Sequence, residues 1–101
     1  MSKVALNISI EFEPGSKEDI LRALLAHRER CLKEEPGIIQ VEILVPSAEP
    51  SKIFLFELYT DGSALSAHSA GQSIARFRDD VKGKVLNIKS YNCSLANESK
   101  L

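Results

Sequence analysis

Four side chains that can carry or exchange protons lie close together in the middle of the sequence: Glu57, Tyr59, Asp61 and His68. Glu57 and Tyr59 end an apolar run typical of a buried strand, Asp61 starts a turn, and His68 follows on a short helical segment. This order can bring a carboxylate and an imidazole into one cavity. Imidazole is the side chain that proteins use most often as a general base, so His68 is a candidate base, the alternative being a hydrogen-bonded core histidine. For Glu57 the alternative is a paired structural carboxylate, because a buried carboxylate needs partners.

Tyr59 and two further side chains, Asn7 and Arg28, are candidates for contact with a ligand. Asn7 shares the polar face of a predicted strand with Ser9, and its amide could hold an oxyanion; a solvated or interfacial face is the alternative. Arg28 could place a cation at the mouth of a cavity, or lay its stem over apolar surface with its head in water. Tyr59 could stack on an aromatic ligand or simply pack.

The elements that must position these residues follow from the apolar periodicity of the chain. Alternation predicts strands, Pro36-Gly37 ends the first helix, and Gly71 interrupts the second. The predicted order is a strand at 4–12, a helix after Ser16, strands at 38–45 and 52–59, a short helix at 62–69, a helix carrying Ile74, Phe77 and Val81, a strand at 85–95 and a loose tail at 96–101. This β-α-β-β-α-β order predicts an α+β, ferredoxin-like antiparallel sheet with helices on one face.

Helical spacing in the first helix predicts one buried stripe, with His27 on its flank and Arg28 near its middle. The predicted stripe consists of Ile20, Leu21, Leu24, Leu25, Arg28, Cys31 and Leu32. On the last helix, Arg76 and Arg78 are predicted to be solvated.

The strand at 52–59 is apolar on both faces, with Phe54 and Phe56 on one side and Ile53 and Leu55 on the other. Helices can cover only one of these faces. A second copy of the same sheet is the simplest cover for the other, so we expect a homodimer through the sheet.

The composition excludes several classes of protein. A chain of 101 residues is expected to form a single domain at 1–101. Lys and Arg number 13 against 14 Asp and Glu, without the basic stripe of a nucleic-acid binder. No apolar run approaches the ~20 residues that span a membrane. Asn7 and Ser9 interrupt the apolar run near residue 1, so we expect these residues not to act as a signal peptide. The two cysteines, Cys31 and Cys93, lie far apart, which favours reduced thiols in a cytoplasmic protein. Neither a Gly-rich phosphate loop nor a metal-binding spacing is present, so we expect no flavin, haem or metal cofactor.

Several short motifs together resemble the antibiotic biosynthesis monooxygenase (ABM) domain family, and the resemblance covers nearly the whole chain. The residues that carry it are Glu35-Pro36-Gly37, Phe56-Glu57-Leu58-Tyr59, Asp61, Ala64-Leu65, His68 and Ser73-Ile74-Ala75-Arg76-Phe77. The resemblance implies a dimeric α/β barrel. It also implies an enzyme that oxidises a small aromatic quinol or a polyketide-like substrate with molecular oxygen and without a cofactor.

In such an enzyme the resemblance implies catalytic roles for His68 as the base and Asn7 as the donor to the substrate anion. The candidate substrate contacts, from their residue types and positions, are Tyr59, Glu57 and Arg28. Other members of the family degrade haem, isomerise or only bind small molecules, so a non-oxidative domain that binds or isomerises a small metabolite is the alternative. Many members carry Trp where this chain has Tyr59. Gln72 stands where a second His is common, and haem ligation normally uses such a His, so haem degradation is disfavoured.

Overall fold

The computed structural model describes residues 2–98, which form four strands and three helices. The order is β1 (Val4–Phe12), α1 (Lys17–Glu34), β2 (Ile38–Leu44), β3 (Lys52–Tyr59), α2 (Gly62–Ser69), α3 (Gln72–Asp80) and β4 (Val85–Ser94). The strands pair in the order β2-β3-β1-β4, and every pairing is antiparallel. This confirms the predicted α+β, ferredoxin-like arrangement. Of the predicted tail, residues 96–98 form a turn, and residues 99–101 lie outside the described part of the chain.

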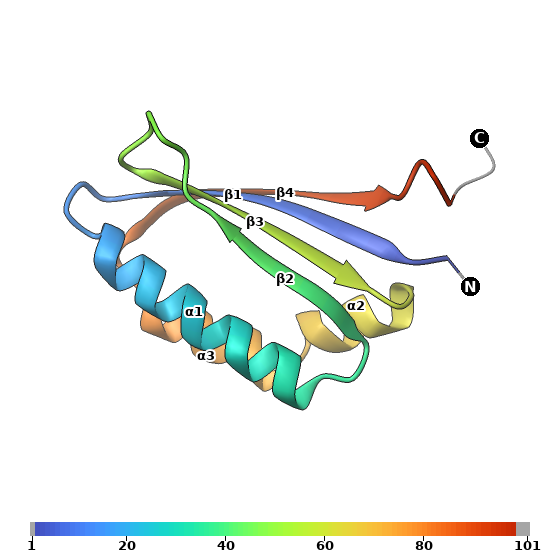
Figure 1. Cartoon of the computed structure of the whole chain (residues 1–101). Coiled ribbons are helices and arrows are strands. Elements are labelled where there is room, and N and C mark those ends of the chain that lie inside the picture. The colour runs from blue at the N-terminus through green and yellow to red at the C-terminus, as the bar shows by residue number, and fades with distance from the viewer. Residues whose placement is uncertain (1, 99–101) are drawn as a thin grey trace.

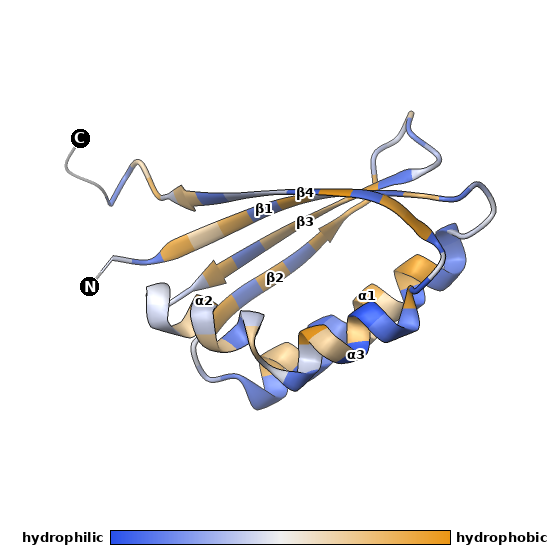
Figure 2. Ribbon diagram, turned by 180° about the vertical axis from the view of Figure 1, so that it is seen from behind, coloured by the Kyte–Doolittle hydropathy of each residue, from blue (hydrophilic) through white to orange (hydrophobic). Residues whose placement is uncertain are grey.

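All three helices lie against one face of the sheet, here called the inner face, and no helix among residues 2–98 covers the outer face (Figures 1 and 2). The core fills the space between the inner face and α1 and α3, and includes Ile10, Phe12, Leu24, Val41, Ile53 and Phe77. The described helices include none that is long and apolar enough to cross a membrane.

The register of the sheet decides which side chains reach the helices. Leu6 of β1 pairs with Glu57 of β3, and Ile8 pairs with Leu55, so these four side chains share the inner face. Asn7 pairs with Phe56 on one side and with Tyr91 of β4 on the other, which places these residues on the outer face. Alternation along β1 and β3 therefore separates two different surfaces.

The buried stripe of α1 differs from the predicted one by a small rotation of the helix. Ala23 and His27 are buried, whereas Leu25 and Leu32 are 55% and 40% exposed, so the prediction was wrong for these two leucines. The apolar residues cover a wider arc of α1 than the sheet can bury, and the sequence pattern alone did not locate its centre.

Candidate active site

Two strand residues and one helix residue form the centre of a buried polar cluster on the inner face. Glu57 and Tyr59 stand two positions apart on β3, so both side chains point toward the helices. Asp61 caps α2 by accepting a hydrogen bond from the backbone N–H of Ala64 at 2.9 Å, as the sequence predicted. The capped helix carries His68 into the interior, where its side chain is only 4% exposed. The structure thus brings together His68, Glu57 and Tyr59.

Helix α1 adds three polar side chains that were not among the predicted site residues: His27, Cys31 and Glu35. They are spaced four residues apart and therefore follow one face of the helix and its C-cap. His27 and Cys31 are buried, and Glu35 is partly buried. The i, i+4, i+8 spacing was the signal that could have found them. It aligns His27 and Glu35 with Cys31, which the sequence had already placed in the buried stripe.

The polar atoms of this cluster form a connected set of close contacts. Tyr59 Oη donates a hydrogen bond to Glu57 Oε1 at 2.6 Å, and His27 Nε2 lies 3.6 Å from Glu57 Oε2. His68 Nδ1 lies 3.0 Å from Glu35 Oε1, whereas His68 Nε2 lies 3.9 Å from Glu57 Oε1. The first of the two His68 contacts is a hydrogen bond, and the second is too long to be one. The Nε2 atom of His68 is therefore not held by Glu57.

The electrostatics of the cluster keep one carboxylate ionised and two other groups neutral. Burial alone would raise the pKa of Glu57, but its contacts with His27 and Tyr59 and the nearby charge of His68 outweigh burial, so its pKa lies below the usual value. Burial, followed by the charge of Glu57, raises the pKa of Tyr59. Burial and the charges of Glu35 and Glu57 raise the pKa of the Cys31 thiol from 9.0 to about 12. Cys31 is therefore a neutral thiol rather than a nucleophilic thiolate.

A cavity of about 210 Å³ opens beside this cluster, between the inner face of the sheet and helices α2 and α3. His27, Glu57 and His68 form part of its wall, and Ser69, Ser90 and Arg78 add polar atoms. The remaining wall is apolar and consists of Leu6, Ile8, Ile10, Leu55, Ile74, Phe77 and Ile88. The arrangement offers a small apolar chamber with acid and base groups in one part of its wall.

Three side chains could in principle share a metal ion, since the donor atoms of His27, Cys31 and His68 lie within 4.8 Å of one another. However, Cys31 Sγ lies 3.4 Å from Nε2 and 3.8 Å from Nδ1 of His27. Nearly equal distances to both nitrogens place the sulfur beside the ring rather than along the lone pair of either nitrogen. A shared metal would need the His27 ring to turn, so the three residues do not form a ready coordination site.

Two of the predicted site residues lie away from the cluster. Asn7 is exposed on the outer face, where it lines a shallow hollow with Phe54 and Tyr91. Within one chain the sheet itself separates Asn7 from His68. Arg28 lies beside β2, where its Nε donates a hydrogen bond to the carbonyl oxygen of Val41 at 2.8 Å. Arg28 does not line the cavity, and its head anchors α1 to the sheet.

Comparison with known proteins agrees with this architecture. The sequence matches the family described as Antibiotic biosynthesis monooxygenase over residues 3–80. No curated protein is a significant match. Among solved structures, a protein from Nitrosomonas europaea, provisionally named an antibiotic biosynthesis monooxygenase, superposes with a TM-score of 0.88 at 18% identity, covering 97% of this chain and 94% of that one.

Two further structures show the same fold. A protein from Bacteroides thetaiotaomicron with the same provisional name has a TM-score of 0.85 at 17% identity, covering 94% of this chain and 90% of that one. A protein from Shewanella oneidensis has a TM-score of 0.79 at 22% identity, and the alignment covers 94% of each chain. At such identities the superpositions speak for the fold, whereas the family match rests on the sequence itself. This chain belongs to the antibiotic biosynthesis monooxygenase family.

Proposed function

We propose that this protein is a cofactor-independent monooxygenase that oxidises a small aromatic quinol with molecular oxygen. The observation that carries the proposal is the apolar cavity of about 210 Å³ with His68, His27 and Glu57 in its wall. Pockets for drug-sized ligands measure about 300–1,000 Å³, so this cavity favours a single-ring or compact two-ring substrate over a long polyketide.

The proposed reaction begins with a proton transfer. His68 Nε2 accepts the proton of a phenolic hydroxyl, and the substrate becomes a phenolate. The phenolate passes one electron to O₂, and the resulting radical and superoxide combine at a ring carbon to form a C–O bond. The peroxide takes up the proton held by His68 to become a hydroperoxide. The C–H bond at the same ring carbon then loses its proton as the O–O bond breaks, the leaving hydroxide and this proton form water, and a new carbonyl is left on the ring. One oxygen atom enters the product and the other leaves as water, so the substrate supplies all the electrons.

The other polar side chains have supporting roles in this scheme. The hydrogen bond from Tyr59 fixes the Glu57 carboxylate beside the two imidazoles, with its oxygens 3.6 Å from His27 Nε2 and 3.9 Å from His68 Nε2. Apolar walls exclude water from the radical pair and from the peroxide. Arg78 is exposed and borders the cavity, so it can attract an anionic substituent on the substrate.

We further propose that two copies of the chain associate through their outer faces. The support is an uncovered set of apolar side chains: Phe54, Leu44 and Tyr91 are 38%, 53% and 61% exposed, and they surround the hollow beside Asn7. Such a patch on a sheet without covering helices is typical of a self-association surface. In the dimer, Asn7 would lie at the interface between the two sheets. The oxyanion role predicted for Asn7 would then need a substrate bound between the sheets.

The test is oxygen consumption by the purified protein with a panel of reduced mono- and bicyclic quinols, with autoxidation subtracted in parallel samples. We expect uptake of one O₂ per quinol without added flavin, metal or reductant, and incorporation of one labelled oxygen atom from ¹⁸O₂ into the product. Saturable binding of the same quinols without enzyme-dependent oxygen uptake would instead support the alternative, a non-oxidative domain that binds or isomerises a small metabolite.

A further inference from the structure

The segment Glu35-Pro36-Gly37 does not line the cavity, yet it contacts the proposed base directly. Helix α1 ends at Glu34, and Glu35 is its C-cap, with its backbone N–H bonded to the carbonyl oxygen of Cys31 at 3.0 Å. Pro36 cannot continue the helix, and the N–H of Ile38 closes the turn by bonding to the carbonyl oxygen of Glu35 at 3.1 Å. The turn therefore fixes the place from which the Glu35 side chain starts.

Gly37 brings helix α2 close to this turn. A β-carbon at Gly37 would collide with the β-carbon of Ala64, so glycine is needed there for close approach rather than for an unusual backbone angle. The carbonyl oxygen of Gly37 also accepts a hydrogen bond from the N–H of Thr60 at 2.9 Å, just before α2 begins. His68 lies one turn after Ala64 on the same helix, so the packing at Gly37 sets the distance between His68 and Glu35.

The contact between Glu35 and His68 determines which ring nitrogen carries hydrogen. Glu35 Oε1 lies 3.0 Å from His68 Nδ1, and an ionised carboxylate can only accept. Nδ1 must therefore be the donor, which leaves Nε2 as the unprotonated nitrogen of the neutral ring. Nε2 lies on the side of Glu57, which borders the same cavity as His68, and it makes no hydrogen bond with that carboxylate at 3.9 Å.

We propose that Glu35-Pro36-Gly37 is a positioning device that holds His68 in its Nδ1–H form, so that Nε2 is free to accept the substrate proton. The proposal rests on the proposed function for the identity of that proton, but the orientation of His68 can be measured without any substrate. Glu35 acts through His68 and touches no reacting atom, so it is a positioning residue.

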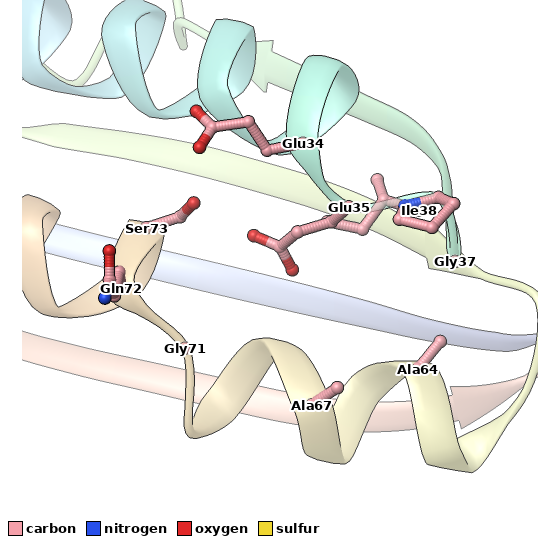
Figure 3. A pocket seen from close by; sticks show the side chains of 10 residues that line it. Glu34, Glu35, Gly37, Ile38, Ala64, Ala67, Gly71, Gln72 and Ser73 are labelled. Carbon is pink, nitrogen blue, oxygen red and sulfur yellow. The ribbon is translucent and has the colours of Figure 1, made fainter.

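The surroundings of Glu35 explain how it can do this from outside the cavity. A groove of about 400 Å³ runs between the end of α1, helix α2 and the start of α3, and Glu35 lies on its wall with Gly37 and Ala64. In Figure 3 the Glu35 side chain extends from the end of α1 into this space, above Ala64 and Ala67 of α2. His68 thus lies on the wall of the cavity, and Glu35 lies on the wall of the groove. The proton taken up at Nε2 is returned to the peroxide, while the Nδ1 proton stays in the bond to Glu35.

The test is ¹⁵N-correlated NMR of the imidazole rings, which distinguishes Nδ1–H from Nε2–H in the neutral form. We expect the wild-type protein to show His68 as Nδ1–H. In Glu35→Gln, the amide can present its oxygen or its nitrogen to the ring, so we expect the Nε2–H form to appear. In Glu35→Ala, Nδ1 loses its acceptor, so we expect the population of the Nε2–H form to be larger than in the wild type. Glu34→Gln is the matched control, since Glu34 is exposed, borders the same groove and makes no contact with His68 within residues 2–98.

Kinetics with an accepted quinol supply the second measurement. We expect Glu35→Gln to lower kcat on the order of 10- to 100-fold with little change in KM, the range found when a metal-bound histidine loses the carboxylate that orients it. Glu35→Asp should recover part of the loss, and Gly37→Ala should lower kcat by displacing α2 while Glu35 is still present.

An Nε2–H tautomer in the wild type, or a tautomer that is the same in the wild type and both Glu35 variants, would overturn the positioning role. If the tautomer responds to Glu35 but no quinol supports oxygen uptake, the positioning role stands and the proposed reaction is wrong.

Discussion

The two faces of one sheet show how the same strands can serve different purposes. On the inner face, β1 and β3 present Leu6, Ile8, Glu57 and Tyr59 to the helices, and the two polar side chains are buried and paired. The intervening residues Asn7, Phe54 and Phe56 point to the outer face. No helix among residues 2–98 covers that face (Figure 2). A step of one residue along a strand thus separates a closed acid–base site from an open apolar surface. Variants on each face should accordingly affect different properties.

The largest effect is expected from removing His68 on the inner face. His68→Ala should lower oxygen uptake on the order of 10²–10⁴-fold, because a positioned base is lost, and leave the melting temperature nearly unchanged. Asn7→Ala is the matched outer-face variant, and its turnover should stay at the wild-type level if the chemistry is confined to the inner face. A drop on the order of 10–10³-fold for Asn7→Ala, as for a lost oxyanion donor, would place the reaction between two sheets. Unchanged specific activity in a destabilised His68→Ala protein would mean that His68 is a packing residue.

Next in size is the loss of assembly from a charge on the outer face. Phe56→Asp should convert a dimer to a monomer in light scattering at micromolar concentration, because an unpaired carboxylate would enter the proposed interface. Glu11→Gln alters an exposed side chain on the outer face of β1 and serves as the control. A wild-type protein that is already monomeric at this concentration would exclude the dimer.

The inner cluster should also limit stability at both ends of the pH scale. Glu57 has a lowered pKa in the folded state, so its contribution is present above the ordinary value of 4.5 and is lost as the pH falls through the lowered folded value. Cys31 has a pKa raised from 9.0 to about 12, so its contribution is present below pH 9 and is lost as the pH rises toward 12. Urea unfolding at a series of pH values should show both declines. Glu57→Gln should flatten the acid one, and Cys31→Ala should reduce the alkaline one.

The two cysteines should differ in their reactivity toward an alkylating reagent, because they lie on opposite sides of the sheet. Cys31 is buried on the inner side, whereas Cys93 pairs with Ala5 on the outer face and is partly exposed. Iodoacetamide at neutral pH should therefore modify Cys93 first and leave Cys31 unmodified in the native protein, because the thiolate is the reactive form. Mass spectrometry of tryptic peptides distinguishes the two sites. Equal labelling of both cysteines would contradict the buried, neutral state of Cys31.

The smallest effect is expected at the rim of the cavity. Arg78→Ala should raise KM a few-fold for a quinol with a carboxylate substituent and leave KM for a neutral quinol unchanged, because an exposed cation mainly assists encounter. Arg76 is the matched control on the same helix, since it pairs with Asp80 at 3.4 Å and does not border the cavity. The same change in KM for both variants would show that only overall charge matters.

The sequence predicted the strands and helices well because their signals are local. The alternation in Val4–Phe12, the continuous apolar run in Lys52–Tyr59 and the cap at Asp61 could be recognised without knowledge of distant contacts. The sequence also indicated that Glu57 and His68 could meet in one cavity, with Tyr59 on the same strand face as Glu57. It did not predict that His27, Cys31 and Glu35 join them, because this depends on the rotation of α1 over the sheet.

The placement of Asn7 depended on a different kind of information. Its polar face on β1 was recognised, but a polar face can line a site or face away from it, and only the pairing of β1 between β3 and β4 distinguishes the two. For Arg28 the sequence left two alternatives, a cation at a cavity mouth or a stem over apolar surface with its head in water. A hydrogen bond to the carbonyl oxygen of Val41 directs the head to the edge of the sheet.

The pairing of β1 with β4 also bears on how the chain folds. Val4 lies opposite Ser94, so the central strand acquires its second neighbour only when the two ends of the sequence meet. Closing so long a loop costs entropy before the hydrogen bonds of this ladder are gained, which makes it a late step in folding. Ile88 and Ser90 of β4 form part of the cavity wall, so a nascent chain that lacks its last strand has a sheet and helices but no closed chamber. During synthesis, the cavity is therefore completed only after β4 has left the ribosome.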